Sequence, residues 1–219
     1  MEFFLRQVYP WLIEVSSYSP LLPFIIGIYF FRKQKSIQFR LLFLLIAVNV
    51  VHEVISQITV IMGTSNNLWS FYIFTPLVFG IEAAIYYNCF TGAVVKKGIL
   101  VAVGLVAGIT IYDAVILEGI TQMNSVSRMV THSFIIVLVI AYFYKIANDR
   151  SIVYLDRDPI FLLSCSLLIY YAGTSMSFAL FNQALEVSYD AARICLTVVL
   201  VLNILFYTSA AFILRRMAV

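Results

Sequence analysis

Residues 49–57, NVVHEVISQ, place polar side chains that could do chemistry inside an otherwise aliphatic stretch. Asn49, Glu53 and Gln57 recur every four residues, and His52 lies beside this row. On a helix, such spacing makes one face polar for two turns. An ionisable side chain at the centre of a membrane-spanning helix costs about 2.5 kcal/mol or more on insertion scales, so it needs a partner or water. The pattern therefore predicts that this face points into the protein, where it could bind a small ligand, a proton or a cation.

Similar polar side chains interrupt other apolar segments of the chain. They are Glu82, Tyr86, Asp113, His132, Tyr170, Tyr171, Thr174, Ser175, Asn203 and Tyr207. A helical rise of about 1.5 Å per residue places Glu53 and Glu82 about 10 Å apart along the membrane normal, which argues against a paired carboxylate dyad. The predicted ligand-binding residues are Asn49, His52, Glu53, Gln57, Glu82, Tyr86, Tyr170, Thr174, Asn203 and Tyr207.

Each of these residues also has a purely structural interpretation. Hydrogen bonds between helices explain polar residues without any function, and four candidates suit that role: Asn49, Thr174, Ser175 and Asn203. Glu53 and Glu82 can each be protonated and hydrogen-bonded to a tyrosine. His52 points about 100° away from Glu53 on a helix, so the two do not automatically pair, and a structural histidine is the simpler interpretation.

The elements that must position these residues are membrane-spanning helices. The 219-residue chain is 63% hydrophobic and 11% charged, whereas soluble domains carry roughly 25% charged residues. A span needs about 20 mainly apolar residues. Seven segments qualify, near residues 9–31, 39–62, 68–91, 98–117, 128–147, 158–182 and 191–214. The short connections between them predict an all-α fold, a single domain over residues 1–219 with seven transmembrane helices.

Basic residues predict the orientation of this bundle in the membrane. Eleven of the 14 fall on one side: Arg32, Lys33, Lys35, Arg40, Lys96, Lys97, Lys145, Arg150, Arg157, Arg215 and Arg216. Arg6, Arg128 and Arg193 fall on the other side. Because Lys and Arg concentrate in cytoplasmic loops, we expect the N-terminus outside and the C-terminus inside a plasma membrane, the inner membrane of a bacterium. The first residues lack the pattern of a cleaved signal peptide, so we expect the first helix to be retained.

Prolines and one aspartate predict local helix geometry. Pro20 and Pro23 in the first span and Pro76 in the third remove backbone donors and favour kinks. In the run DRDP, Asp158 is a predicted helix N-cap followed by Pro159 at the first helical position.

Several classes of function are disfavoured. The last span has no lysine for a retinal Schiff base, and His52 and His132 are too few for the zinc site of seven-helix hydrolases and poorly placed for haem. No Ser/His/Asp set, phosphate-binding glycine loop or HExxH motif is present, so we expect no enzyme, cofactor or metal. The net charge of +3 gives no reason to expect nucleic acid. The three cysteines lie in apolar segments and are interpreted as packed thiols.

The arrangement of spans resembles carriers built from parallel repeats. With seven spans, the first three and the last three run in the same sense around a single linker helix, as in sugar and vitamin carriers. Glu82 and Tyr86 have the same spacing as Asn203 and Tyr207. The Pro-Gln dipeptide of one such carrier family is absent.

A second resemblance is carried by HE at residues 52–53, NNLWSFYIFTPLVFGIEAAIYY at residues 66–87 and DPIFLLSCSLLIYYAG at residues 158–173. These stretches resemble the small stand-alone seven-helix membrane proteins of Bacteroidota, which are similar to membrane sensor regions of histidine kinases. The matching positions are Glu53, Asn66, Asn67, Glu82, Asp158, Pro159, Tyr170 and Gly173. The resemblance implies a sensory role, exercised through a separate signalling protein.

Three hypotheses follow. The first is a receptor-like protein that binds a small or lipid-like ligand inside the bundle and reports to a partner. The second is a small-solute or proton-coupled carrier in which Glu53 or Glu82 binds a proton or cation. The third is a scaffold subunit of a larger membrane complex. In all three, the lipid bilayer is a partner.

Overall fold

The computed structural model describes residues 3–64, 66–148 and 155–218, and within them every regular element is helical. Seven helical segments are long and apolar enough to cross a membrane, as the sequence predicts. They are Phe4–Phe31, Ile37–Ile61, Trp69–Cys89, Ala93–Leu117, Ser125–Asn148, Pro159–Val187 and Tyr189–Ala218. The first and fourth begin five residues before the predicted starts at 9 and 98.

The first span is divided in two at Pro20. A π-helical turn, η1 (Phe4–Val8), leads into α1 (Tyr9–Tyr18), and α2 (Leu21–Phe31) begins directly after Pro20. Proline has no backbone N–H and its ring crowds the preceding turn, so the sequence prediction of an interruption here is confirmed. The helix that contains Pro76, α4 (Trp69–Cys89), continues through its proline as one element.

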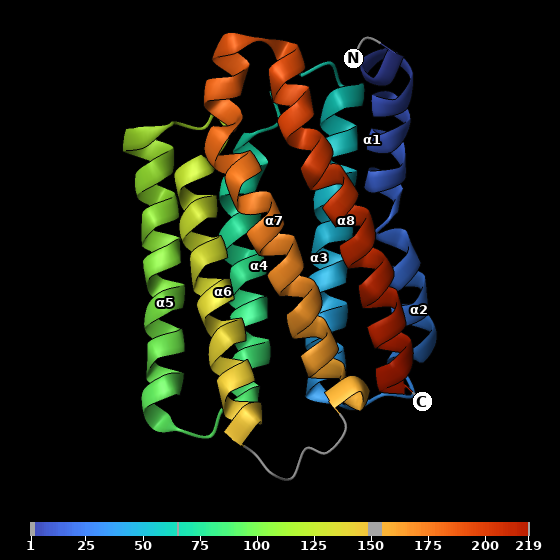
Figure 1. Ribbon diagram of the computed structural model, residues 1–219, viewed down its shortest axis with the longest axis vertical. Coiled ribbons are helices and arrows are strands. Elements are labelled where there is room, and N and C mark those ends of the chain that lie inside the picture. The colour runs from blue at the N-terminus through green and yellow to red at the C-terminus, as the bar shows by residue number, and fades with distance from the viewer. Residues whose placement is uncertain (1–2, 65, 149–154, 219) are drawn as a thin grey trace.

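The other helices run side by side with these (Figure 1). They are α3 (Ile37–Ile61), α5 (Ala93–Tyr112) with the π-helical turn η2 (Asp113–Leu117), α6 (Ser125–Asn148), a short 3₁₀ turn η3 (Leu155–Arg157), α7 (Pro159–Val187) and α8 (Tyr189–Ala218). The chain begins at one end of the bundle, here called the N-terminal end, and α8 finishes at the opposite C-terminal end (Figure 1).

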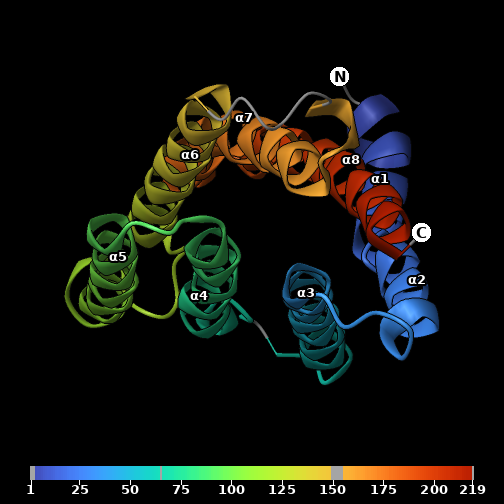
Figure 2. The same ribbon diagram turned by 90° about the horizontal axis from the view of Figure 1, so that it is seen from below.

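Six of the seven spans form a ring. Going round it, α2 contacts α3, α3 contacts α4, α4 contacts α6, α6 contacts α7, α7 contacts α8, and α8 returns to α1 and α2. The remaining span, α5, packs on the outside against α4 and α6 (Figure 2). Consequently α3 and α4 face α7 and α8 across the interior of the ring.

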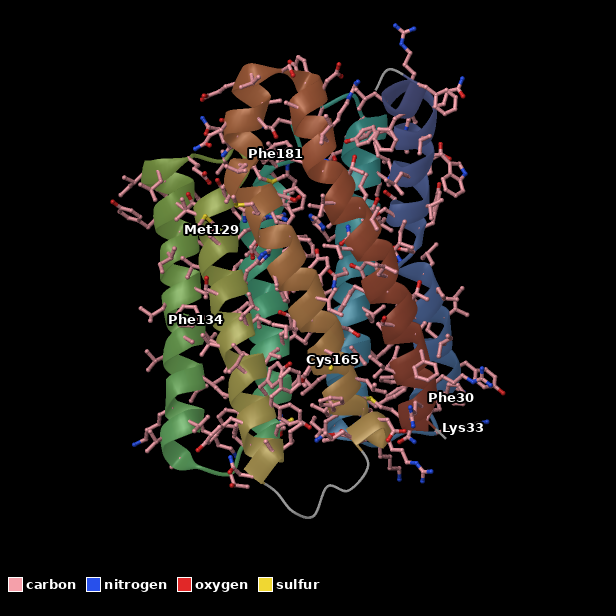
Figure 3. All side chains as sticks on the ribbon, viewed as in Figure 1. Phe30, Lys33, Met129, Phe134, Cys165 and Phe181 are labelled. Atoms are coloured by element: carbon pink, nitrogen blue, oxygen red, sulfur yellow. The ribbon has the colours of Figure 1, made fainter. Side chains whose placement is uncertain are left out.

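The interior is filled with apolar side chains in its C-terminal half. Fully buried residues there include Phe39, Leu42, Leu45, Ile46, Phe79, Ile85, Leu163, Leu167, Ile213 and Leu214. A smaller cluster around Phe178 and Phe181 closes part of the N-terminal end. Figure 3 shows Phe181 at that end and Cys165 in the opposite half. The polar residues of α3 lie one to three turns beyond this apolar layer, between the two clusters.

Two aspartates accept hydrogen bonds from backbone N–H groups at the starts of helices. Asp158 accepts a hydrogen bond from the Ile160 backbone N–H at 2.9 Å, with Pro159 at the first helical position, so the predicted N-cap is confirmed. The hydroxyl of Tyr142 donates to the other oxygen of Asp158 at 2.6 Å. Asp113 is fully buried, and its Oδ2 accepts from the backbone N–H of Ser127 at 3.0 Å, at the start of α6. Asp113 therefore holds one helix end to another.

The three cysteines, Cys89, Cys165 and Cys195, are free thiols and half-buried, which agrees with their interpretation as packed thiols.

Candidate functional site

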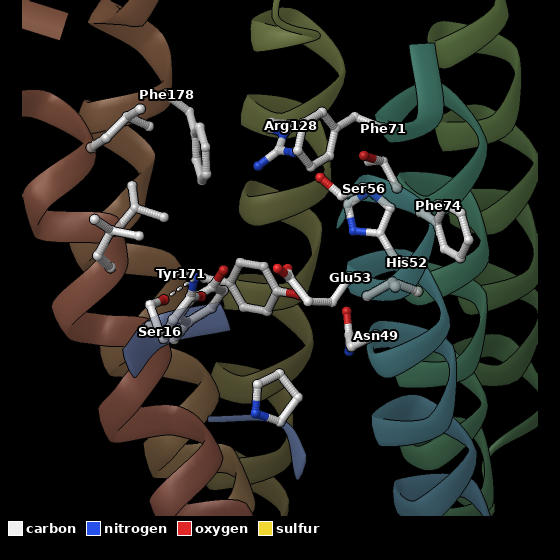
Figure 4. Close-up of a pocket in the computed structure, with 18 of the residues that line it drawn as sticks. Ser16, Asn49, His52, Glu53, Ser56, Phe71, Phe74, Arg128, Tyr171 and Phe178 are labelled. Carbon is white, nitrogen blue, oxygen red and sulfur yellow. Dashed lines mark hydrogen bonds between the residues drawn. The ribbon is translucent and has the colours of Figure 1, made fainter. Parts of the chain in front are cut away.

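A cavity of about 270 Å³ lies inside the ring, in its N-terminal half (Figure 4). At roughly 30 Å³ per water molecule, this is room for about nine waters or one small molecule. Its wall is polar for a membrane bundle. The polar lining consists of Ser16, Ser17, Asn49, His52, Glu53, Ser56, Thr75, Arg128, Thr131, His132, Tyr170, Tyr171, Asn203 and Tyr207.

The structure brings six of the ten predicted binding residues to this wall. They are Asn49, His52, Glu53, Tyr170, Asn203 and Tyr207, contributed by α3, α7 and α8. The four-residue spacing of Asn49 and Glu53 puts both on one face of α3, and at these two positions that face turns to the ring interior.

The other four predicted residues lie elsewhere. Gln57 is exposed, and its amide donates to Glu53 Oε1 at 2.9 Å, so it orients the carboxylate from outside the cavity. Thr174 is fully buried and donates to the carbonyl of Tyr170, in its own helix, at 2.8 Å. Tyr86 is also fully buried, with its hydroxyl 3.0 Å from Ser164 Oγ. Glu82, the fourth, is sealed behind the cavity wall.

Glu82 has a tyrosine as its hydrogen-bond partner, which agrees with the structural interpretation of this carboxyl group from the sequence. Its side chain is 2% exposed. The Tyr171 hydroxyl lies 2.7 Å from Oε1 and 2.8 Å from Oε2 of Glu82. Glu53 and Glu82 therefore have different partners and form no dyad. Since Tyr171 also lines the cavity, it is the one hydrogen-bonded residue between the cavity and Glu82 in the described part of the chain.

Both histidines line the cavity, and among the described residues neither pairs with an acid. His52 Nε2 lies 3.1 Å from Ser70 Oγ, whose own hydrogen goes to the carbonyl of Asn67. Ser70 must therefore accept, and Nε2 of His52 carries the hydrogen. By the same argument His132 Nδ1 donates to Ser175 Oγ at 3.2 Å. In a neutral imidazole, this leaves His52 Nδ1 and His132 Nε2 as hydrogen-bond acceptors.

Arg128 is the charged cavity residue that the sequence prediction missed, since its place near the start of a span made it look like a loop charge. Its guanidinium carbon lies 4.2 Å from the ring centre of Phe71 and 4.1 Å from that of Phe178. Nε donates to Asn124 Oδ1 at 2.8 Å. A signal was available, because Arg128 and His132 are four residues apart and so share one helix face.

The broken first span also contributes to the wall. Ser16 comes from the turn before the break, and Asn203 of α8 reaches its hydroxyl at 3.4 Å. A second, mainly apolar groove of about 170 Å³ lies between the first span and α3 and shares Ser17, Pro20 and Glu53 with the main cavity. The cavity therefore has a side wall that reaches towards the lipid-facing surface.

Glu118 stabilises the start of α6 next to this cavity. Its Oε2 accepts from the Ser125 backbone N–H at 2.6 Å, and Oε1 accepts from the Asn182 amide at 3.0 Å. Burial, followed by the neighbouring Asp113, raises the pKa of Glu118. The contacts join α6 to α7 at the N-terminal end.

Metal binding finds no support in the described residues, where no three His, Cys, Asp or Glu side chains gather in one group. Comparison with family models, curated proteins and solved structures finds no match to this chain. The resemblance to the Bacteroidota proteins and to sensor regions of histidine kinases therefore stays a prediction.

Proposed function

We propose that this protein is a receptor-like membrane protein that binds a small polar molecule in the cavity and reports its presence to a separate signalling protein. The observation that supports the proposal is the cavity itself. It combines an arginine, a carboxylate and two imidazoles with unused hydrogen-bonding capacity. Burying such groups between helices is costly unless something pairs with them.

Loop charges support an orientation with the N-terminal end outside. Ten of the eleven basic residues assigned to the C-terminal side lie in the described chain, and Arg150 lies outside it. Arg128 lines the cavity and no longer counts as a loop charge. The remaining bias of eleven to two favours a cytoplasmic C-terminus, in a plasma membrane such as the bacterial inner membrane. The cavity would then take its ligand from the outer half of the membrane.

The position of α8 suggests how occupancy could reach a partner. Asn203 and Tyr207 on this helix line the cavity, and the same helix continues to Arg215 and Arg216 at the C-terminal end. A ligand that contacts Asn203 and Tyr207 would favour one position of α8, and a partner at the C-terminal end could detect that position.

A carrier is the second candidate, favoured by the order of helices in the ring. Rotating the ring by half a turn places the first three spans on the last three, with α5 left outside as the linker. Parallel-repeat carriers are built in this way. The matching spacing of Glu82 with Tyr86 and of Asn203 with Tyr207 gives weaker support. Asn203 and Tyr207 line the cavity, whereas Glu82 and Tyr86 are buried away from it.

The test is native mass spectrometry of the protein released from lipid nanodiscs. Leu200 lines the cavity, so Leu200→Trp should fill it, whereas Leu205 on the same helix is 54% exposed and serves as the matched control. We expect a bound small molecule in the wild type and in Leu205→Trp, and its loss in Leu200→Trp. Equal occupancy in all three proteins, or none, would contradict the proposal.

Uptake measurements separate receptor from carrier. Proteoliposomes that accumulate the identified molecule, and lose this activity in Glu53→Gln, would show a carrier. Binding without accumulation supports the receptor. A stoichiometric partner that copurifies with an empty cavity would instead indicate the scaffold.

A further inference from the structure

Two opposite charges face the cavity without pairing with each other. Arg128 and Glu53 are directed into the same space from α6 and α3 (Figure 4). No described carboxylate oxygen lies within 4.0 Å of the Arg128 guanidinium, because the one ion pair between described residues that the structure shows is Arg193 with Asp190. The cavity thus holds one cation and one acid at separate places on its wall.

Arg128 has donors to spare. Among the described residues only Asn124 accepts a hydrogen bond from it, at Nε, so both terminal nitrogens keep their hydrogens free of described partners. Among the described residues, Oδ1 of Asp113 is the one side-chain nitrogen or oxygen that is fully buried and has no hydrogen-bond partner, so the terminal nitrogens of Arg128 are not fully buried. The terminal nitrogens of Arg128 are therefore open to the cavity. Phe71 and Phe178 hold the guanidinium plane, which leaves a planar fork suited to a carboxylate.

Glu53 has an acceptor to spare. Gln57 donates to its Oε1, and Oε2 receives no hydrogen bond from the described residues. Oε2 is not sealed either, and Glu53 lines both the cavity and the outer groove that adjoins it. The hydroxyl of Tyr207 and the amide of Asn49 line the same wall and offer further acceptors for an ammonium group.

Charge balance decides which ligand satisfies both groups. An anion alone would pair with Arg128 and leave Glu53 unpaired, and a cation alone would do the reverse. A buried charge without a partner is strongly destabilising. A molecule with both charges pairs each group and adds no net charge to the membrane interior. The volume of about 270 Å³ limits that molecule to amino-acid size.

We infer that the cavity takes a small zwitterion, with its carboxylate on Arg128 and its ammonium on Glu53. This inference rests on the proposed function, because it names the chemical class of the ligand for the same cavity.

Isothermal titration of the full-length protein in nanodiscs tests the inference with probes of matched skeleton. These are γ-aminobutyrate, butyrate and butylamine, with glycine and 5-aminovalerate to vary the distance between the charges. We expect one of the amino acids to bind at least about 30-fold more tightly than butyrate or butylamine, the effect of removing one partner of a buried charge pair. Equal binding of an amino acid and its singly charged analogue would overturn the inference.

Variants test which cavity residue binds the ammonium and which binds the carboxylate of the ligand. Glu53→Gln should remove the preference for γ-aminobutyrate over butyrate, and Arg128→Gln should remove the preference over butylamine. Arg193→Gln, at an exposed ion pair of the same end, should change neither. If Arg128→Gln does not fold, Arg128→Lys, which keeps the charge but loses the fork, should weaken binding of the carboxylate. An unchanged preference in a folded Glu53→Gln protein would refute the assignment of the ammonium.

The outcomes separate this inference from the proposed function. If no probe binds, the zwitterion is excluded at this size. If mass spectrometry nevertheless finds an occupant without an amine or an acid, the proposed function stands and only the inference fails. If the cavity is also empty, both fail.

Discussion

Tyr171→Phe should destabilise the protein because it leaves a sealed carboxyl group without a partner. Glu82 is 2% exposed, and the Tyr171 hydroxyl is its one hydrogen-bond partner among the described residues. Leaving a buried polar group unsatisfied costs about 1–3 kcal/mol. Hydrogen bonds between membrane helices average about 0.6 kcal/mol and reach about 1.7 kcal/mol. Since both oxygens of Glu82 depend on one hydroxyl, we expect a loss near 1.7 kcal/mol in the free energy of unfolding.

A double-mutant cycle separates this bond from other effects. Replacing both partners, Tyr171→Phe with Glu82→Leu, removes the unsatisfied group and should cost less than Tyr171→Phe alone. Tyr86→Phe is the matched control, because it breaks a buried bond between two neutral hydroxyls, to Ser164, and should cost about 0.6 kcal/mol. Reversible unfolding by SDS in mixed micelles measures all of these. Additive effects, or a loss in Tyr171→Phe no larger than in Tyr86→Phe, would refute the reasoning.

Three further predictions use the same unfolding assay. Gly27→Ala should cost about 1–3 kcal/mol, because its Cβ would fall on the ring of Phe43, whereas Gly80→Ala, with open space around it, should be neutral or slightly stabilising. Asp158→Ala should cost about 1 kcal/mol through the lost N-cap, and no loss would remove that role. Burial and a neighbouring acid raise the pKa of Glu118 above its ordinary 4.5, so the folded protein binds that proton more tightly than the unfolded chain. The contribution of this proton to the free energy of unfolding is full below pH 4.5 and is lost as the pH rises through the folded-state pKa. Glu118→Gln should therefore flatten this part of the plot of stability against pH. An unchanged plot would contradict the assignment.

The fold was predictable because membrane insertion imposes strong constraints on sequence. Seven long apolar segments, the break at Pro20 and the cap at Asp158 follow from span length, the missing N–H of proline and the N-cap preference of aspartate. The row from Asn49 to Glu53 was also predictable, because polar side chains in a span must turn inward.

The shape of the site was not predictable, because it depends on which neighbours fill the interior. Glu82 and Tyr86 were assigned to the binding site from their types, but large apolar residues pack around them. Arg128 was counted as a loop charge, because a basic residue at the end of a span suits either topology or a cavity. Asp113 looked like an inward-facing acid and instead caps α6 from a neighbouring element. The position of a residue along its span can be read from the sequence, but it does not show which side chains of other helices the residue contacts.

The most direct test of the polar cavity is thiol accessibility in nanodiscs. In a background without Cys89, Cys165 and Cys195, Asn203→Cys places a thiol in the cavity, and Leu205→Cys places one on the outer surface of the same helix. Thiolates react in water and not in hydrocarbon. We predict that a small cationic methanethiosulfonate labels Asn203→Cys and leaves Leu205→Cys unmodified. An unreactive Asn203→Cys, or equal labelling at both positions, would contradict a polar cavity inside the bundle.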